Sequence, residues 1–543
     1  MKKSISFIVS VFSASLVCAQ PTHVPVASYT QHPMGYSGYS LATLPASWQG
    51  NFSSEPDDIA SDKTYHYQTA VSAFMYNPVT EDASDDIVII KKQAANGLTT
   101  SIATIDIAHA IGLSSWSDEV IKGMLIDVSL GRLYVFGSTN VHGFNQGYIL
   151  CVKTSTLAPD LTFSSTGVQF LYTAPGNVVM DMDIIEPGKY LALVQMNGYV
   201  NLVGIKTDGT WLGMFSLSNP AYSCVGNRLR KAPNNTFFIA GRAANSSGVY
   251  IPMLWDLSCM TSPFSMSLLK KTNDSFTSPV VGTGDYVDFG FHDTGKLGLD
   301  GLPGIELMVV GNRNANVNGP NTGIYAKYSI NATSLAPYTT YTNNTTLPGI
   351  HSSFSFTRCL VQPDGYVVFV GRDDTQPPMF DSFLGYINTT GTAYTTTHAF
   401  QEVHKVRALN KDYSSGDVIA GGCDMGNGGW STIRFTSYSG TWSACANKMT
   451  GIALSNNDEA TELKMFPNPC NNVIKIEGLT AENKAVTIQV LDMKGSLVKE
   501  LNNFAVFNAA TGLSIDVSDL QEGQYIIRVI NNEQCHTVRM VKN

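Results

Sequence analysis

The sequence predicts an all-β protein, in which a seven-bladed β-propeller is followed by a small C-terminal β-sandwich. Short apolar runs rich in Val, Ile, Tyr and Phe recur along the central region, and the last eighty residues alternate apolar with polar side chains. Charged residues make up only 14% of the chain, against about 25% in an ordinary soluble domain. This composition favours many short strands joined by polar turns.

The central region carries an internal repeat, and each unit contains an apolar run of four or five residues that is often closed by Gly. The runs end at positions 90, 137, 194, 241, 311, 371 and 421, so they are spaced by 47 to 70 residues. Such a period indicates a propeller, in which four-stranded sheets cover one another's faces. Six blades, eight blades or two stacked β-sandwiches remain alternatives. The runs are Ile87–Ile90, Leu133–Gly137, Tyr190–Val194, Phe237–Gly241, Leu307–Gly311, Val367–Gly371 and Val418–Gly421.

One stretch of the repeat is more specific. Leu157–Val168 contains Asp160, Phe163 and Gly167, in the order Asp, Phe and a following Gly. It resembles the Delta-60 repeat, and a weaker copy lies at 335–341. The resemblance implies a divergent propeller.

The C-terminal eighty residues open with Met465-Phe466-Pro467-Asn468-Pro469 and continue as short alternating strands from 473 to 542. Gly495 and Gly523 lie where the chain must reverse. The segment resembles the type A C-terminal sorting domain of type IX secretion cargo, which is found in Bacteroidetes. The resemblance implies that residues 465–543 contact the type IX secretion machinery and direct the protein to the medium or the outer-membrane surface. An ordinary immunoglobulin-like module is the alternative.

The N-terminus is typical of an exported protein. Lys2 and Lys3 precede the apolar stretch Ile5–Val17, and Cys18-Ala19 supplies small residues at a cleavage site. A lipoprotein anchor on Cys18 is the alternative. No later apolar run has the length of about 20 residues that a membrane span needs. The expected organisation is a signal peptide (1–19), an N-terminal extension (20–55), the propeller (56–445), a linker cut during export (446–464) and the sorting domain (465–543).

The formal net charge of −9 argues against a nucleic-acid partner, which would need clustered Lys and Arg. The sequence contains no Gly-rich phosphate loop, no Gly-x-Ser-x-Gly elbow and no His-Glu-x-x-His zinc motif. No catalytic residue and no organic cofactor are therefore assigned.

A Ca²⁺ site is the one metal site that the sequence suggests. Residues 291–307 resemble the calcium loops of integrin-type propellers, where oxygen ligands alternate before an apolar strand. The candidate ligands are Asp293, Asp300 and Glu306. A turn that connects two blades is the alternative.

Aromatic residues in polar, loop-like stretches are the candidate ligand-binding residues, because exposed rings stack on the faces of sugars. Rings that wedge between blades are the alternative. The candidates are Trp116, Tyr338, Tyr341, Trp430 and Trp442.

Cys470 and Cys535 flank the first and last strands of the C-terminal module. A disulfide between them would close the module, provided that the geometry allows it.

These observations favour a secreted binding or adhesion protein whose ligand is a glycan or a surface protein. The alternative is a carbohydrate-active enzyme, either a glycoside hydrolase or a polysaccharide lyase, for which Asp364, Asp373 and Asp374 are the nearest carboxylate candidates. A self-associating surface-layer protein is a third hypothesis. Whether the protein is an enzyme stays open at this point.

Overall fold

The structure is a computed structural model, and the chain divides into two compact units, Met1–Thr441 and Trp442–Asn543, which are described separately. It describes residues 28, 39–43, 58–73, 85–115, 117–171, 175–217, 223–244, 248–272, 283–297, 303–314, 321–330, 337–342, 354–362, 365–373, 382–387, 393–399, 404–424, 429–435, 464–466, 470–477, 486–492, 497–504, 513–521, 523–531 and 534–542.

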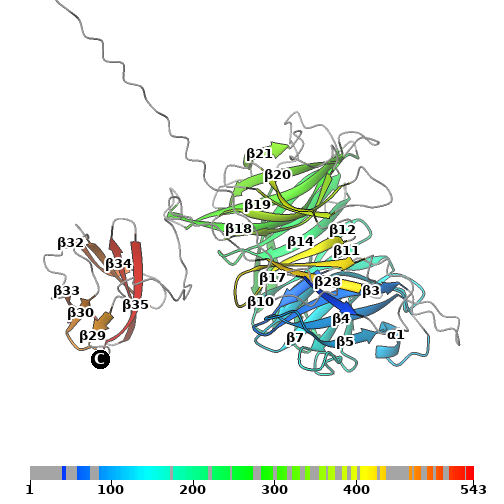
Figure 1. Cartoon of the computed structure of the whole chain (residues 1–543), viewed down its shortest axis with the longest axis horizontal. Helices are drawn as coiled ribbons and strands as arrows, with labels where there is room; N and C mark the ends of the chain where they lie inside the picture. Colours follow the sequence, from blue (N-terminus) through cyan, green and yellow to red (C-terminus); the bar gives the residue numbers. More distant parts are fainter. Residues whose placement is uncertain are drawn as a thin grey trace, which may run out of the picture. The chain divides into compact units, whose positions relative to one another are not determined.

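Within these ranges, the first unit consists of four-stranded antiparallel sheets (Figure 1). Six of them are built from four consecutive strands. The first and second sheets are β2 (Asp58–Ser61), β3 (Tyr65–Ala73), β4 (Asp85–Gln93) and β5 (Thr99–Ile105), then β6 (Glu119–Asp127), β7 (Arg132–Thr139), β8 (Gln146–Lys153) and β9 (Val168–Phe170). The third and fourth are β10 (Asn177–Glu186), β11 (Lys189–Met196), β12 (Tyr199–Lys206) and β13 (Trp211–Ser216), then β14 (Cys224–Lys231), β15 (Phe237–Ala244), β16 (Tyr250–Thr261) and β17 (Phe264–Lys271). The fifth and sixth are β18 (Thr283–Leu297), β19 (Pro303–Asn314), β20 (Asn321–Ser329) and β21 (Pro337–Thr342), then β22 (Phe354–Val361), β23 (Val367–Asp373), β24 (Ser382–Ile387) and β25 (Ala393–Ala399).

A seventh sheet joins the two ends of this unit. It combines β26 (His404–Lys411), β27 (Val418–Asp424) and β28 (Gly429–Phe435) with β1 (Tyr39–Thr43), which pairs antiparallel with β28. Part of the expected N-terminal extension is therefore a strand of the propeller-like unit, because β28 would otherwise be an unpaired edge.

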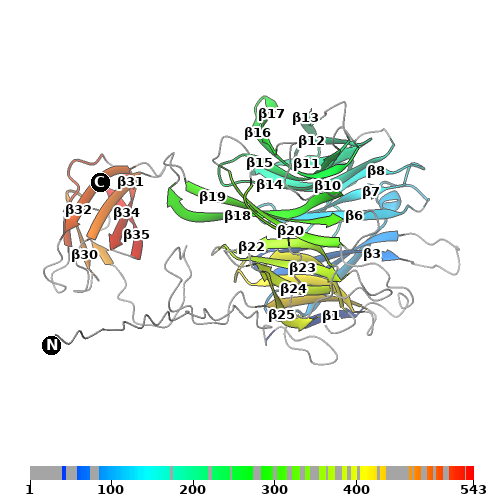
Figure 2. The same ribbon diagram turned by 90° about the horizontal axis from the view of Figure 1, so that it is seen from above.

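Each sheet contacts the next one along the chain, and β2 of the first sheet contacts β26 and β27 of the last (Figure 2). The expected all-β, propeller-like fold is confirmed.

The apolar runs form strands near the middle of each sheet. Six of them lie on the second strand of their sheet, for example Phe237–Gly241 on β15, whereas Ile87–Ile90 lies on the third strand of the first sheet. Ile239 and Val309 are completely buried. These strands are apolar on both faces because a neighbouring sheet covers each face.

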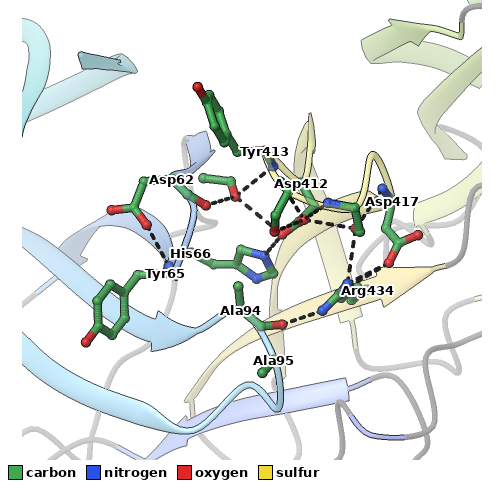
Figure 3. A network of polar contacts seen from close by, with 12 residues as sticks. Asp62, Tyr65, His66, Ala94, Ala95, Asp412, Tyr413, Asp417 and Arg434 are labelled. Atoms are coloured by element: carbon green, nitrogen blue, oxygen red, sulfur yellow. Dashed lines mark hydrogen bonds and ion pairs between the residues drawn. The ribbon is translucent and has the colours of Figure 1, made fainter. Parts of the chain in front are cut away.

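The contact between the first and the seventh sheet is polar and buried (Figure 3). His66 Nε2 lies 2.6 Å from Asp412 Oδ2, and both side chains are almost fully buried. Arg434 pairs with Asp417 at 2.7 Å and donates to the carbonyl of Ala94. His66 and Asp412, together with the nearby Ser61, therefore join the two sheets through buried polar contacts.

A second polar link lies deeper in the same contact. Lys92 is completely buried, and its Nζ donates to Thr432 Oγ1 at 3.0 Å. The hydroxyl of Thr432 in turn donates to Gln68 Oε1 at 2.9 Å. Burial lowers the pKa of Lys92 to about 7.

In the described part of the chain the one helix is α1 (Ile107–Ala110), with Asp106 as its N-cap. No helix among these residues has the length and apolar character of a membrane span.

The second unit consists of a three-stranded and a four-stranded sheet within its described residues, and Ile474, Ile488, Val490 and Ile527 are buried in one core. Most of the expected alternating segments fall on these strands. The strands are β29 (Lys464–Phe466), β30 (Val473–Glu477) and β33 (Leu513–Asp516), then β32 (Leu497–Phe504), β31 (Val486–Asp492), β34 (Gly523–Asn531) and β35 (Gln534–Lys542).

The expected disulfide between Cys470 and Cys535 is wrong. The N–H of Cys470 donates to the carbonyl of Val541 at 2.8 Å, near the end of β35. Cys535 lies near the start of the same strand, about 20 Å away at the usual rise per residue. A disulfide needs Cα atoms within about 7 Å, and Cys470 is a free, buried thiol.

Candidate functional site

A bulge recurs near the start of the innermost strands. In six of them, from β6 to β26, the pairing register shifts by one residue. A bulge leaves one extra residue outside the ladder and re-aims its side chain. All six extra residues line a single cavity of about 380 Å³, called here the bulge cavity. They are Lys122, Met180, Asn227, Val287, Thr357 and Arg407.

The glycines that close the apolar runs make room for these bulges. A Cβ on Gly137 would lie 1.7 Å from the carbonyl oxygen of Val120, and one on Gly241 would lie 2.0 Å from that of Val225. Real Cβ atoms do not approach backbone so closely. The recurring Gly of the sequence is therefore part of the device that shapes the bulge cavity.

The bulge cavity is cationic. Its lining includes Lys122, Arg228, Arg358 and Arg407, and Asp285 is the one acid among the described lining residues. Arg407 is exposed and Lys122 is half-buried, so both charges reach solvent. An anionic group would therefore find net positive charge in this cavity.

A ring of buried carboxylates lies next to the bulges. Asp58 Oδ2 accepts from the N–H of Met124 at 3.0 Å, and Asp181 Oδ2 accepts from the N–H of Leu229 at 2.8 Å. Asp288, on β18, accepts in the same way from the N–H of Cys359, on β22. Each donor lies two residues after a bulge residue, on a strand at the edge of its sheet, so the carboxylate satisfies an edge N–H that has no neighbouring strand to accept it.

Two arginines contact this ring. Arg228 lies 3.4 Å from Asp181 and 3.9 Å from Asp288, and Arg230 lies 2.9 Å from Asp288. Burial alone would lower the pKa of Arg228, but Asp181 and Asp288 raise it above its ordinary value. These arginines are therefore charge partners of the ring.

Arg358 is in a different electrostatic position. Burial and the neighbouring Arg228 lower its pKa, against the opposite effect of Asp58 and Asp288. The surrounding acids therefore compensate the charge of Arg358 less completely than that of Arg228.

A second cavity of about 320 Å³ also borders the ring. Its described lining carries three acids and three arginines, so its charge is balanced. Arg228 and Arg358 line both cavities. The cationic excess is thus confined to the bulge cavity, which makes it the candidate functional site. The charged lining of the second cavity is Asp58, Asp181, Asp183, Arg228, Arg230 and Arg358.

Two of the three predicted Ca²⁺ ligands, Asp293 and Glu306, lie on neighbouring strands of the fifth sheet. Across β18 and β19, Asp293 is opposite Ile305, and Glu306 is opposite His292. Successive residues of a strand point to opposite faces, so Asp293 and Glu306 lie on opposite sides of the sheet. Glu306 instead lies 3.1 Å from His292 and 3.8 Å from Lys327. Asp300 lies outside the described residues.

Three of the five predicted aromatic residues lie in the described part of the chain. Tyr338 and Tyr341 lie on strand β21, and Trp430 lies on strand β28, so all three are in strands rather than in loops. Trp116 and Trp442 lie outside the described residues. Their role as ligand-binding residues stays a prediction. Asp364 and Asp374, named for the enzymatic alternative, also lie outside the described residues.

Sequence reasoning did not name the residues of the bulge cavity. A signal was present, because Arg228-Leu229, Arg358-Cys359-Leu360 and Arg407-Ala408-Leu409 each come about ten residues before an apolar run. Sequence does not show, however, that Arg407 is a bulge residue whereas Arg228 and Arg358 follow one.

The C-terminal unit has a recognisable sequence. Residues 464–543 match the family described as the secretion system C-terminal sorting domain. The chain carries a type IX sorting tail. This tail implies interaction with the type IX secretion machinery and export to the medium or the cell surface. The match begins one residue before the expected boundary at 465. No curated protein matches the chain in sequence.

Several solved structures are similar to the chain. An ulvan lyase, described as a new family of polysaccharide lyase, is 10% identical with a TM-score of 0.44, over 77% of this chain and 96% of the other. The β-propeller domain of the trilobed protease from Pyrococcus furiosus is 7% identical with a TM-score of 0.38, over 70% and 93%. Drosophila Semaphorin 1a is 9% identical with a TM-score of 0.38, over 71% and 86%.

Proposed function

We propose that this protein is type IX secretion cargo whose seven-bladed propeller binds an acidic polysaccharide at the bulge cavity. The single observation that carries this proposal is the cationic lining of the cavity, with Lys122 and Arg407 open to solvent. The chain as a whole has a formal net charge of −9, so this patch of positive charge departs from the rest of the molecule.

The chemistry of the lining favours carboxylate or sulfate groups. A guanidinium presents a planar fork of N–H donors that matches either group. The cavity volume of about 380 Å³ falls in the range of small-molecule sites, about 300 to 1,000 Å³. One or two acidic sugar units would fill it, and Asn227 and Thr357 supply further hydrogen-bonding groups.

We also propose how the chain is processed during export. Residues 1–19 are removed as a signal peptide, residues 446–464 are cut as a linker, and the source is a Bacteroidetes bacterium. The mature protein then acts as a binding or adhesion module outside the cell, where acidic polysaccharides occur.

Binding is tested with the purified full-length chain and a panel of immobilised polymers at 50 mM and 300 mM NaCl. Polygalacturonate, alginate and dextran sulfate are the anionic probes, and dextran is the neutral control. We expect retention on at least one anionic polymer, no retention on dextran, and weaker retention at the higher salt concentration because surface charges are screened. Equal behaviour on dextran and dextran sulfate would contradict the proposal.

The same incubations distinguish binding from catalysis. The supernatants are analysed for shorter sugars by chromatography and for unsaturated products by their ultraviolet absorbance. Retention without products supports a binding protein. Product release would replace this function by the hydrolase or lyase alternative.

The export part is tested by deletion of residues 465–543 in the native host. We expect the truncated chain to accumulate in the periplasm while the full chain reaches the surface or medium. Appearance of the truncated chain in the medium would show that the tail is not needed for export.

A further inference from the structure

Three buried carboxylates meet between the first and second sheets, at a place that the bulge cavity does not include. Asp86 lies on β4, Asp106 is the N-cap of α1, and Glu119 is the first residue of β6. One oxygen of each carboxyl lies within 4.8 Å of those of the other two. Their exposed fractions are 2%, 7% and 1%.

The surrounding hydrogen bonds fix two of these carboxyls. The N–H of Ser117 donates to Asp106 Oδ2 at 3.1 Å, and the hydroxyl of Ser117 donates to Glu119 Oε1 at 2.6 Å. The hydroxyl of Thr139 donates to the same Oε1 at 3.0 Å. The N–H of His109 also donates to Asp106, at 2.7 Å. The carboxyl groups are therefore held in place by the loop and by the strand next to β6.

The second carboxylate oxygen of Glu119 distinguishes this cluster from a fully hydrogen-bonded group of buried acids. Glu119 Oε2 is buried and has no hydrogen-bond partner among the described residues. A buried carboxylate oxygen without a donor is costly, and two further carboxylates nearby add repulsion. A cation would satisfy this oxygen and neutralise its neighbours.

We propose that Asp86, Asp106 and Glu119 bind a Ca²⁺ ion. All the donors are hard oxygens, which favours Ca²⁺ or Mg²⁺ over Zn²⁺ or copper. Ca²⁺ accepts six to eight oxygens in irregular arrangements, whereas Mg²⁺ demands a near-ideal octahedron. Three carboxylates offer up to six oxygens.

One further feature is consistent with this site. Asp118 and Val120, on either side of Glu119, are exposed, so the cluster lies next to solvent. The ion would join the first two sheets at an edge of the unit.

The test uses the chelator-treated full-length chain, titrated calorimetrically with CaCl2 and heated with and without 1 mM CaCl2. We expect saturable Ca²⁺ binding and a higher Tm with Ca²⁺ than with the same concentration of MgCl2. Glu119→Gln should weaken the Kd for Ca²⁺ at least tenfold. Glu186→Gln, at an exposed carboxylate paired with Lys189, is the matched control and should bind as the wild type does.

Folding does not limit this test. Without Ca²⁺, Glu119→Gln should unfold at the same temperature as the wild type or a higher one, because Gln keeps an acceptor oxygen for Ser117 and Thr139 and adds N–H donors beside the two other carboxyl groups. An unchanged Kd in Glu119→Gln would overturn the proposal, and so would a wild-type protein without saturable binding or a Ca²⁺-dependent Tm. A higher Tm with MgCl2 than with CaCl2 would reassign the ion.

Discussion

The carboxylate of Asp181, on the third sheet, accepts a hydrogen bond from the N–H of Leu229, on the fourth sheet, at 2.8 Å. The same relationship joins Asp58 to Met124 at 3.0 Å, from the first sheet to the second. A third pair joins the fifth sheet to the sixth. In each pair the donor lies two residues after a bulge residue, so the bond between the sheets anchors the strand segment beside the bulge cavity.

Asp181→Ala should destabilise the propeller strongly. The substitution leaves the N–H of Leu229 without this acceptor and removes a buried partner of Arg228. Breaking one side of a buried pair costs about 3 to 5 kcal/mol. Urea unfolding measures the loss. Asp208→Ala, at an exposed turn, is the control and should change little. Equal midpoints for the two variants would contradict the role given to Asp181.

Gly241→Ala should also destabilise the propeller. The added Cβ would lie 2.0 Å from the carbonyl oxygen of Val225, and relief would require movement of the bulge. A loss of about 1 to 3 kcal/mol is expected from overpacking. Gly421→Ala is the matched control at the same place in its repeat, where the nearest atom is a side-chain carbon of Ala408 at 3.2 Å. Its loss should be smaller, and the reverse order would refute this explanation of the recurring glycine.

The buried His66 should make the folded protein less stable at mildly acidic pH. Burial lowers the pKa of His66, and Arg434 and Lys92 lower it further, against the effect of Asp412. The unfolded chain therefore takes up a proton below about pH 6.5 while the folded chain does not. The free energy of unfolding should fall with pH there, by at most about 1.4 kcal/mol per pH unit.

His66→Gln isolates that contribution. Chemical unfolding of both proteins is measured from pH 7.5 to pH 5.0. The difference in stability, wild type minus variant, should decrease as the pH falls below about 6.5. Asp412 does not interfere in this range, because its pKa is held far below its ordinary value. Parallel curves would mean that His66 does not titrate differently in the two states.

Lys92 should make the stability of the protein depend on pH above neutrality. Its pKa is about 7 in the fold and 10.5 in the reference state. Between these values the unfolded chain holds a proton that the folded chain lacks, so stability rises with pH across this window. Lys92→Met, which cannot titrate, should gain most over the wild type at pH 6.5 and less at pH 9.5. Thermal unfolding at both values checks this, and a pH-independent difference would be the contrary result.

Much of the fold could be predicted from the sequence. Apolar runs such as Leu307–Gly311 fall on strands because two-sided burial requires continuous apolar character. The register shifts were not predictable, since a bulge depends on pairing between strands. The expectation that residues 20–55 stand apart was incomplete for a related reason: β1 is defined by its pairing with β28, almost 390 residues away.

The site was predicted poorly. Asp293 and Glu306 carry carboxylates that suit Ca²⁺, but the alternation of side chains along a strand places them on opposite faces of the sheet. Asp86, Asp106 and Glu119 are brought together by three different elements, which no local motif announces. In both cases the three-dimensional position of the carboxylates, rather than the residue type, determines whether they can share an ion.

The bulge cavity should bind an anionic polymer. Calorimetry measures the affinity of the full-length chain for oligogalacturonate or a sulfated oligosaccharide, and the variant Lys122→Gln/Arg407→Gln is measured in the same way. Both residues reach solvent, so the variant should fold normally. Lys206→Gln, an exposed lysine outside the cavity, is the control. We expect at least tenfold weaker binding in the double variant and none of this loss in Lys206→Gln. Equal affinities in all three proteins would contradict binding at the bulge cavity.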